Sequence, residues 1–298
     1  MVLLGGTGFL GRAVAHGILD AGHRLRVLVR DQQKASALRV RGAEVLVGDA
    51  LDQGALRAAC LGADHAVSLV AVRRNRPQSY LEVNVDGPRR LAEAAMYQRV
   101  KSIVFVSAIG AQMNPRYKYL TSRWMGEEEL RKVKIPSTIL RFSFILAEEG
   151  GVVSDFARAA SFGPVMVIPG SGQSRIQPIL RDDAARCVVG AIDRQDLLRH
   201  TLDLGGPEVL TYEQLFNLFV EARGIKKRQL KVPVPLLLPG AYLLELLMSD
   251  PPATPDEVRA IQLDNLAEGL DSVAANFAFP AQSVSAWARQ HWVAQPAG

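Results

Sequence analysis

Short apolar runs alternate with helix-length amphipathic segments through the first two-thirds of the chain. The runs predicted as strands are Val2–Leu4, Leu25–Val29, Glu44–Val47, Ala66–Val70, Ile103–Ser107 and Thr138–Leu140. The segments predicted as helices are Gly11–Ala21, Ala55–Leu61, Gly87–Arg99 and Thr121–Val133. Strands that alternate with helices of this length predict βαβ units and a parallel sheet covered on both faces. We therefore expect an α/β protein with a doubly wound Rossmann sheet, and ligands at the carboxyl ends of its strands.

The pattern changes after about residue 145, where glycine and proline become frequent. The stretch from Gly150 to Gly172 is predicted to be rich in loops. Beyond it the sequence predicts a helix near Asp182–Asp193, a strand near Thr201–Leu204, a helix with a capped start at Thr211, a Pro-rich segment from Pro233 to Pro255 and a last helix near Val284–His291. We expect residues 1–145 to form the Rossmann core and residues 146–298 to form a smaller lobe for a substrate or partner, partly interleaved with the core.

Composition and charge exclude several classes of protein. The chain has 298 residues, of which 48% are hydrophobic and 22% are charged, and its net charge is +5. This composition is that of a folded globular protein, and it excludes a disordered chain, a disulfide scaffold and a nucleic-acid-binding arm. Cys60 and Cys187 are the only cysteines, and the five histidines are scattered without metal-ligand spacing. We expect a cytoplasmic protein without a metal site.

A glycine-rich loop joins the first predicted strand to the first predicted helix. Gly5, Gly8 and Gly11 have the spacing GxxGxxG, which allows a tight turn, a close approach of the backbone to a pyrophosphate and helix–strand packing. The helix that follows offers free N–H groups and a positive dipole end to phosphates. The alternative is a purely structural turn. The position of the loop favours a dinucleotide site, whose predicted contacts are Gly5, Thr7, Gly8, Phe9, Leu10 and Gly11.

The ends of the next strands bear on the choice of cofactor. Arg30 and Lys34 follow the second predicted strand, where a pair of cations suits the 2′-phosphate of NADP(H). Asp31 lies between them and would favour NAD(H) if it turned toward the ribose, so NAD(H) stays open. Asp49 and Ala50 follow the third strand, where the carboxylate would accept a hydrogen bond from the adenine amino group or cap the next helix. Val70, at the end of the fourth strand, completes the predicted cofactor site.

The chain resembles the atypical short-chain dehydrogenases/reductases, which bind NAD(P) on a Rossmann sheet. The motifs that carry this resemblance are GGTGFLG (Gly5–Gly11), LVRD (Leu28–Asp31), VGDALD (Val47–Asp52), NVDGPRRLAEAA (Asn84–Ala95), VFVSAIGA (Val104–Ala111), YLTSRWMGEEEL (Tyr119–Leu130) and STILR (Ser137–Arg141). Three further blocks, Ile176–Ala185, Leu204–Leu215 and Pro251–Val258, resemble the branch of the nucleotide-binding accessory subunit of respiratory complex I and its bacterial relatives. That branch implies a bound NADPH in a structural or regulatory role.

The same resemblance implies a catalytic site that this sequence modifies. The family uses a YxxxK pair and a serine at the end of the fifth strand, and here Ser107 and Tyr119 match while Arg123 replaces the lysine. A guanidinium keeps the positive charge but does not release its proton, so a proton relay is lost while ribose binding can survive. Phe142 and the segment Ala147–Gly150 also depart from the family pattern. Tyr117 lies two residues before Tyr119, so the family tyrosine could also be aligned with Tyr117. Whether the protein is an enzyme therefore stays open.

A basic and apolar segment in the second lobe suggests a partner. Lys226, Lys227, Arg228 and Lys231 precede a stretch, Val232–Met248, whose only acid is Glu245. Such a segment, Lys226–Met248, can bind a subunit of a membrane complex or an anionic membrane surface. Apolar helix faces are usually core, however, which favours leucines that close the lobe, and a lid over the cleft is a third alternative. The favoured function is an NADP(H)-binding accessory or assembly protein, peripheral to a membrane complex. The alternatives are an NADPH-dependent reductase or isomerase of a small apolar carbonyl compound, and a nucleotide-redox sensor. No binding of nucleic acid is expected.

Overall fold

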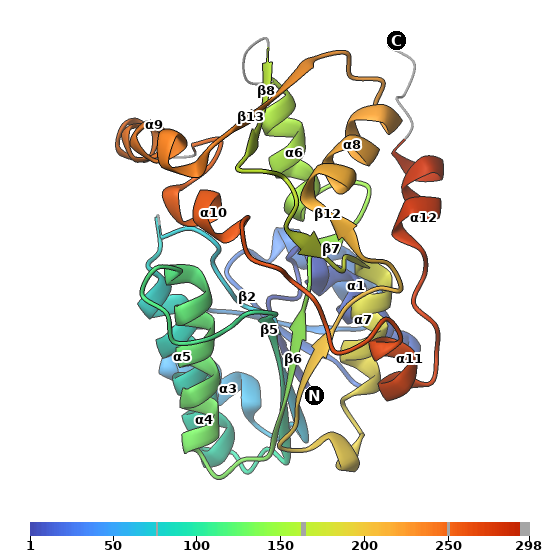
Figure 1. Ribbon diagram of the computed structural model, residues 1–298. Helices are drawn as coiled ribbons and strands as arrows, with labels where there is room; N and C mark the ends of the chain where they lie inside the picture. Colours follow the sequence, from blue (N-terminus) through green and yellow to red (C-terminus); the bar gives the residue numbers. More distant parts are fainter. Residues whose placement is uncertain (76, 162–164, 249–250, 293–298) are drawn as a thin grey trace. The chain divides into compact units, whose positions relative to one another are not determined.

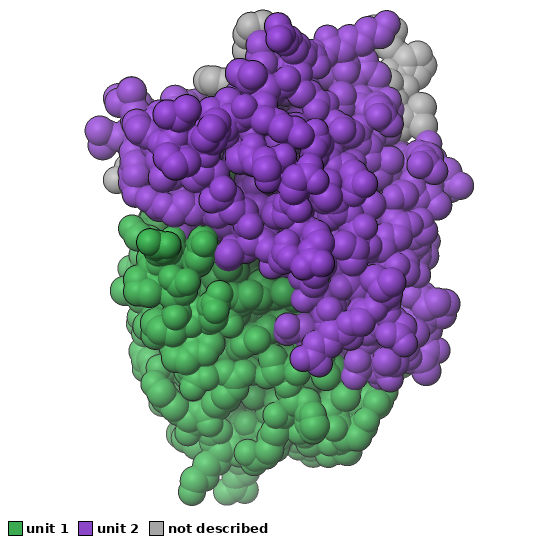
Figure 2. Space-filling model, in the orientation of Figure 1, with its two compact units in different colours: residues 1–142, 181–202 green, residues 143–180, 203–298 purple. Residues whose placement is uncertain are grey.

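The computed structural model describes residues 1–75, 77–161, 165–248 and 251–292. They form two compact units (Figure 2). Unit 1 comprises Met1–Phe142 and Arg181–Leu202, and unit 2 comprises Ser143–Leu180 and Asp203–Gly298. Among the helices of these described ranges, none has the length and apolar character that crossing a membrane requires.

A seven-stranded sheet forms the centre of unit 1, with the order β11-β6-β5-β4-β1-β2-β3 (Figure 1). Its strands are β1 (Val2–Leu4), β2 (Arg26–Val29), β3 (Glu44–Val47), β4 (His65–Ser68), β5 (Ser102–Ala108), β6 (Ser137–Phe142) and β11 (Thr201–Leu204). Neighbouring strands from β3 to β6 are parallel. The strand order reverses between β1 and β4, and ligands of such sheets bind outside the carboxyl ends of the strands at this point. The predicted doubly wound α/β class is confirmed.

Helices cover both faces of this sheet (Figure 1). One face carries α1 (Phe9–Asp20) and α7 (Arg181–Gly190), and the other carries α3 (Gln53–Cys60), α4 (Gly87–Tyr97) and α5 (Lys118–Lys132). Two short helical segments, η1 (Gln33–Ala35) and α2 (Ser36–Val40), connect β2 to β3. The core on the α4 side includes Leu56, Leu91, Phe105, Leu130 and Ile139. Burial on both faces explains why the strands read as nearly continuous apolar runs.

Unit 2 is built around an aromatic core. Phe156 on α6 (Gly151–Ser161) contacts Phe216 and Phe219 on α8 (Tyr212–Ala222), with ring centroids 5.2 and 5.8 Å apart. Trp292, which follows α12 (Val284–His291), lies 5.7 Å from Phe219. The remaining elements are β7 (Ile145–Leu146), β8 (Val165–Pro169), β9 (Arg175–Ile176), β10 (Ile179–Leu180), η3 (Gln195–Leu197, in unit 1), β12 (Leu210–Thr211), β13 (Arg228–Val232), α9 (Val234–Leu247), α10 (Pro255–Ala260) and α11 (Ser272–Phe277).

Two features of unit 2 differ from the prediction. The stretch predicted to be rich in loops contains α6 and β8. Gly150 and Gly151 introduce α6 with positive φ angles, and Phe156 and Ala160 then pack one turn apart into the core. Helix α9 also occupies Val234–Leu247, within the segment from Pro233 to Pro255 that was predicted only to be Pro-rich. The capped start at Thr211 is confirmed, because Thr211 and Gln214 form reciprocal side-chain to backbone hydrogen bonds.

Candidate functional site

The glycine loop joins β1 to α1 in a tight turn. Gly5 has a φ of 83°, and its carbonyl oxygen accepts a hydrogen bond of 3.0 Å from the N–H of Gly8. A Cβ atom at Gly11 would overlap that same carbonyl oxygen, so only glycine fits there. A Cβ atom at Gly5 would lie 3.4 Å from Cγ2 of Val70, which places Val70 beside the loop. The structure thus brings together the first strand, the first helix and the end of β4.

The amino end of α1 is available to an anion. The helix begins at Phe9, and Gly8 in the N-cap position has no side chain to cap it. Thr7 and Phe9 are half-buried and Leu10 is buried, so the backbone of the loop is the part nearest to solvent. Uncapped N–H groups at the positive end of a helix dipole form a binding site for phosphate groups. The loop therefore fits the pyrophosphate of a dinucleotide.

The residues after β2 present cations outward. Arg30 is exposed, and its Nη1 lies 3.4 Å from Oε1 of Gln78. Lys34 is exposed in η1. The carboxylate of Asp31 accepts a hydrogen bond of 2.9 Å from the N–H of Gln33, so one of its oxygens is occupied within its own loop. The loop after β2 thus exposes two cations and one carboxylate, of which one oxygen is engaged within the loop.

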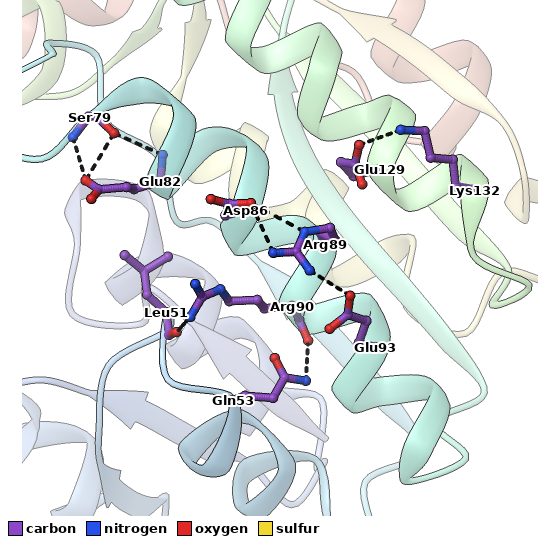
Figure 3. A network of polar contacts seen from close by, with 10 residues as sticks. All are labelled: Leu51, Gln53, Ser79, Glu82, Asp86, Arg89, Arg90, Glu93, Glu129 and Lys132. Carbon is purple, nitrogen blue, oxygen red and sulfur yellow. Dashed lines mark hydrogen bonds and ion pairs between the residues drawn. The ribbon is translucent and has the colours of Figure 1, made fainter.

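The loop after β3 is held to α4 by side-chain to backbone contacts (Figure 3). Nη1 of Arg90 donates a hydrogen bond to the carbonyl of Leu51, and Nε2 of Gln53 donates one of 3.3 Å to the carbonyl of Arg90. Asp49 accepts the N–H of Leu51 at 2.8 Å. The helix α3 is capped by a different carboxylate, that of Asp52, which accepts the N–H of Ala55 at 2.6 Å. Asp49 and its half-buried neighbour Ala50 are thereby kept in a fixed loop at the sheet edge.

Ser107 on β5 donates its hydroxyl hydrogen to a buried carboxylate. Its Oγ lies 2.6 Å from Oε1 of Glu127 on α5. Arg141, the register partner of Ser107 on β6, holds both oxygens of Glu127 through Nε at 2.9 Å and Nη2 at 2.6 Å. Arg131 adds a contact of 3.2 Å. Because the Glu127 side chain has 0% exposure, this bidentate pair is shielded from water and geometrically fixed.

Arg123 lies against the same strand. Its Nη2 donates a hydrogen bond to the carbonyl of Val106, and its guanidinium lies 4.9 Å from the centre of the Phe105 ring. The residue is 2% exposed, and within the described part of the chain its Nε and Nη1 have no hydrogen-bond partner. Burial lowers the pKa of the Arg123 guanidinium, and electrostatic interactions with Tyr119 and Glu127 offset part of this effect. Buried N–H groups without partners are unusual and fit the ribose hydroxyls of a bound nucleotide.

Tyr119 lies in the first turn of α5, four residues before Arg123. Its side chain is half-buried, and its ring centre is 6.2 Å from that of Tyr80. Tyr119, Arg123 and Glu127 therefore follow one face of the helix at intervals of four residues. Tyr117 is in the N-cap position, outside the helix. The spacing of four residues on α5 thus starts at Tyr119.

Asn84 is a central residue of this region that the sequence analysis did not single out. It is completely buried in η2 (Leu81–Asp86), a π-helical segment before α4. Its side chain accepts the N–H of Val72 and donates to the carbonyl of Val72 and to the hydroxyl of Ser122, each at 2.9 Å. Asn84 thereby fixes the loop after β4 against α5. A π-helical segment is often a mark of a functional site, but the sequence carries no simple signal for it.

Known proteins resemble this chain in sequence. A family model described as NAD(P)H-binding matches residues 5–195. The protein named photosystem II assembly factor Ycf39 from Guillardia theta is 26% identical over 243 residues, covering 82% of this chain and 76% of the relative. NADH dehydrogenase [ubiquinone] 1 alpha subcomplex subunit 9 from Mus musculus is 27% identical over 273 residues, covering 89% and 72%. The ceramide reductase from Caulobacter vibrioides is 27% identical over 256 residues, covering 82% and 77%. The resemblance to the complex I branch is confirmed.

Proposed function

The chain belongs to the NAD(P)H-binding family, and we propose that it holds NADP(H) as a structural or regulatory ligand in an accessory or assembly protein of a membrane complex. It would work in the cytoplasm, peripheral to the membrane. The cofactor contacts in this proposal are those of the glycine loop, Arg30, Lys34, Asp49, Ala50, Val70, Ser107, Tyr119 and Arg123. A bound nicotinamide supplies a hydride donor or acceptor, and the question is whether this chain's residues support its use.

The hydrogen bond from Ser107 to Glu127 is the observation that carries the proposal. A hydroxyl has one hydrogen, and here it is donated to a buried carboxylate at 2.6 Å. Ser107 therefore cannot donate at the same time to a substrate carbonyl. Release of this hydrogen would leave Glu127 with one fewer partner in a buried position, which costs free energy. The arrangement supports binding without turnover.

Arg123 supports the same conclusion. A guanidinium remains protonated in proteins, so it cannot pass a proton to or from the Tyr119 phenol. Its Nη2 is also held by the carbonyl of Val106, which limits its movement. Its Nε and Nη1 atoms, which have no partner among the described residues, would instead serve as donors to the nicotinamide ribose. In the family, the lysine binds the nicotinamide ribose and assists proton transfer by the tyrosine. Arg123 can perform the first of these functions but not the second.

NADP(H) rather than NAD(H) is the proposed cofactor because of the loop after β2. Arg30 and Lys34 offer positive charge to a 2′-phosphate, while an oxygen of Asp31 is occupied by the N–H of Gln33. The accessory role is supported by the relatives, since one is named an assembly factor of photosystem II and another a subunit of NADH dehydrogenase. We include in the proposal that the segment 226–248 contacts the membrane complex or an anionic membrane surface.

A second candidate function is an NADPH-dependent reductase or isomerase that acts on an apolar carbonyl compound. Tyr119 favours it, because this phenol lies on α5 one turn before a cation, as in the active members of the family. The relative named ceramide reductase also supports it. The experiment starts with the purified full chain, from which bound nucleotide is released and identified. NADPH oxidation is then followed by absorbance with a panel of ketones and quinones.

Retention of NADP(H) without turnover is the expected result. Tyr119→Phe, which changes one of the proposed cofactor contacts, should then produce no turnover either. Turnover by the unmodified chain that Tyr119→Phe abolishes would overturn the accessory function and establish the reductase. Arg116→Ala, an exposed change before α5, serves as the matched control.

A further inference from the structure

Helix α9 carries four of its seven leucines on its exposed side, while Leu237 and Leu238 are half-buried. Val234 and Ala241 face inward, where they pack with Val258 of α10. Leu236, Leu246 and Leu247 are instead 72%, 71% and 71% exposed. A helix of a soluble domain normally has the opposite arrangement, with leucines inward and charges outward. The inversion shows that α9 lacks a covering partner among the described residues of the chain.

The exposed side of α9 is uniformly apolar. We use the term apolar face for Pro235, Leu236, Pro239, Leu243, Leu246 and Leu247, which are all exposed and, at 100° per residue, share one side of the helix. Glu245, the only charged residue of α9, is half-buried and lies on the side of Val234 and Ala241. Tyr242 marks the edge, where its hydroxyl accepts a hydrogen bond of 2.6 Å from Arg259. The apolar face thus presents no hydrogen-bonding side chain to a partner.

Cations lie on β13, the strand that leads into this helix, and on the two residues before it. Lys227 and Lys231 are engaged, with the carbonyl of Ala160 and the carboxylate of Glu213 respectively. Lys226 and Arg228 are exposed, and neither pairs with a carboxylate in the part of the chain that the structure describes. Exposed cations on the segment that leads into an apolar helix complement an anionic surface.

The length of α9 limits how it can meet a bilayer. Its 14 residues extend about 21 Å, whereas the hydrocarbon core of a bilayer is about 30 Å thick. Two prolines, Pro235 and Pro239, lie within it. The helix is therefore suited to lie in the plane of the interface, with its apolar face among the acyl chains.

We propose that the apolar face of α9 inserts into an anionic lipid monolayer, with Lys226 and Arg228 at the headgroups. A second copy of the chain is a poorer occupant, because a symmetric contact would bring these cations of both copies toward one another. A protein partner normally supplies hydrogen bonds across its interface, and the apolar face offers no side chain to receive them. Membrane insertion of α9 would hold the protein at the bilayer in its proposed accessory role. It rests on the proposed function only in assuming that the protein works at a membrane.

Vesicle flotation of the full chain tests the proposal. Vesicles of phosphatidylcholine alone are compared with vesicles that also contain phosphatidylglycerol, at low and high salt. The unmodified chain should float with the anionic vesicles, and the floating fraction should fall as salt rises. Leu243→Gln combined with Leu247→Gln should reduce partitioning roughly tenfold for each leucine, because burial of a leucine contributes at least that factor. Lys226→Glu with Arg228→Glu should abolish the preference for anionic vesicles.

Matched changes separate this result from a general loss of structure. Val40→Gln with Leu61→Gln removes two exposed apolar side chains of unit 1 and should leave flotation unchanged. NADPH affinity is measured on every variant, so that failure of membrane binding and failure of cofactor binding are seen separately. Flotation that is absent, or that is the same in the leucine variant, would overturn the proposal. A dimer that the leucine variant converts to a monomer, without flotation of the unmodified chain, would assign the face to a second copy.

Discussion

The Ser107 hydroxyl donates its hydrogen to Oε1 of Glu127 over 2.6 Å, and Nε of Arg141 donates to the same oxygen over 2.9 Å. The serine that the resemblance assigns to substrate is thus part of the internal support of β5, β6 and α5. A single buried acid links all three elements. Replacing Glu127 tests how much this buried carboxylate contributes to the stability of unit 1. Changes in the loops proposed to contact the cofactor test nucleotide binding.

Glu127→Gln should destabilise unit 1 by about 3 kcal/mol, because it leaves Arg141 without its buried counter-charge. Urea unfolding followed by circular dichroism measures the change. Glu129→Gln is the matched control on the same helix: it forms an ion pair of 2.6 Å (Figure 3) with Lys132, whose side chain is exposed, and the loss of this pair should cost less than about 1 kcal/mol. Equal effects of the two changes would contradict the role assigned to Glu127.

Gly11→Ala should weaken NADPH binding by roughly tenfold or more, since the added Cβ atom overlaps the Gly5 carbonyl and the loop must shift. Isothermal titration calorimetry measures the affinity. Gly240→Ala adds the same atom in open space on α9 and should leave the affinity unchanged. Unchanged binding in both variants would remove the glycine loop from the cofactor site.

Arg30→Ala should lower the affinity for NADPH by roughly 10-fold to 100-fold, the range for loss of a hydrogen bond to a charged group, and should change NADH binding little. The two dissociation constants are measured side by side. Arg39→Ala removes another exposed arginine of unit 1 and is the control. An equal loss for both nucleotides would show that Arg30 does not contact a 2′-phosphate.

The stability of unit 1 should fall as the pH is lowered below about 6.5. Burial lowers the pKa of His65, with a smaller opposing effect from Asp193. The unfolded chain then binds a proton more readily than the folded one. The stabilisation is therefore complete above the unfolded pKa and is lost as the pH falls through the lowered folded value.

Urea unfolding at pH 7.5 and pH 5.5 measures this dependence. His65→Gln can keep the contact of 2.8 Å with Ser102 and should reduce the difference between the two pH values. His200→Gln, at an exposed histidine, should leave the difference as it is. If the unmodified chain, His65→Gln and His200→Gln all show the same pH dependence, the dependence arises from groups other than His65.

The sheet of unit 1 could be predicted because its central strands are buried on both faces and read as apolar runs between turn signals. The two-residue strands of unit 2 could not, since β9 and β12 form only through pairing between distant segments. The π-helical segment η2 also depends on a distant contact, that of Asn84 with Ser122. Local pattern does not contain this information.

The sequence predicted which residues form the candidate site better than it predicted what their side chains contact. The resemblance gave Ser107, Tyr119 and Arg123, but Glu127 is one of three successive glutamates and has no local distinction. The phase of α5 distinguishes it, because only Glu127 lies four residues after Arg123. That spacing was the available signal. The orientation of the Ser107 hydroxyl depends on packing and required the structure.

The return of Arg181–Leu202 to unit 1 has a consequence for biosynthesis. Helix α7 packs on α1, and the backbone of Ile139 bonds to that of His200, so unit 1 is incomplete when Phe142 leaves the ribosome. Unit 1 cannot be completed until Leu202 has been synthesised. At about 5–20 residues per second, synthesis from Phe142 to Leu202 takes roughly 3 to 12 s. During that interval the α1 surface and the outer edge of β6 lack their covers. A nascent chain of this kind needs protection from aggregation just before its sheet is closed.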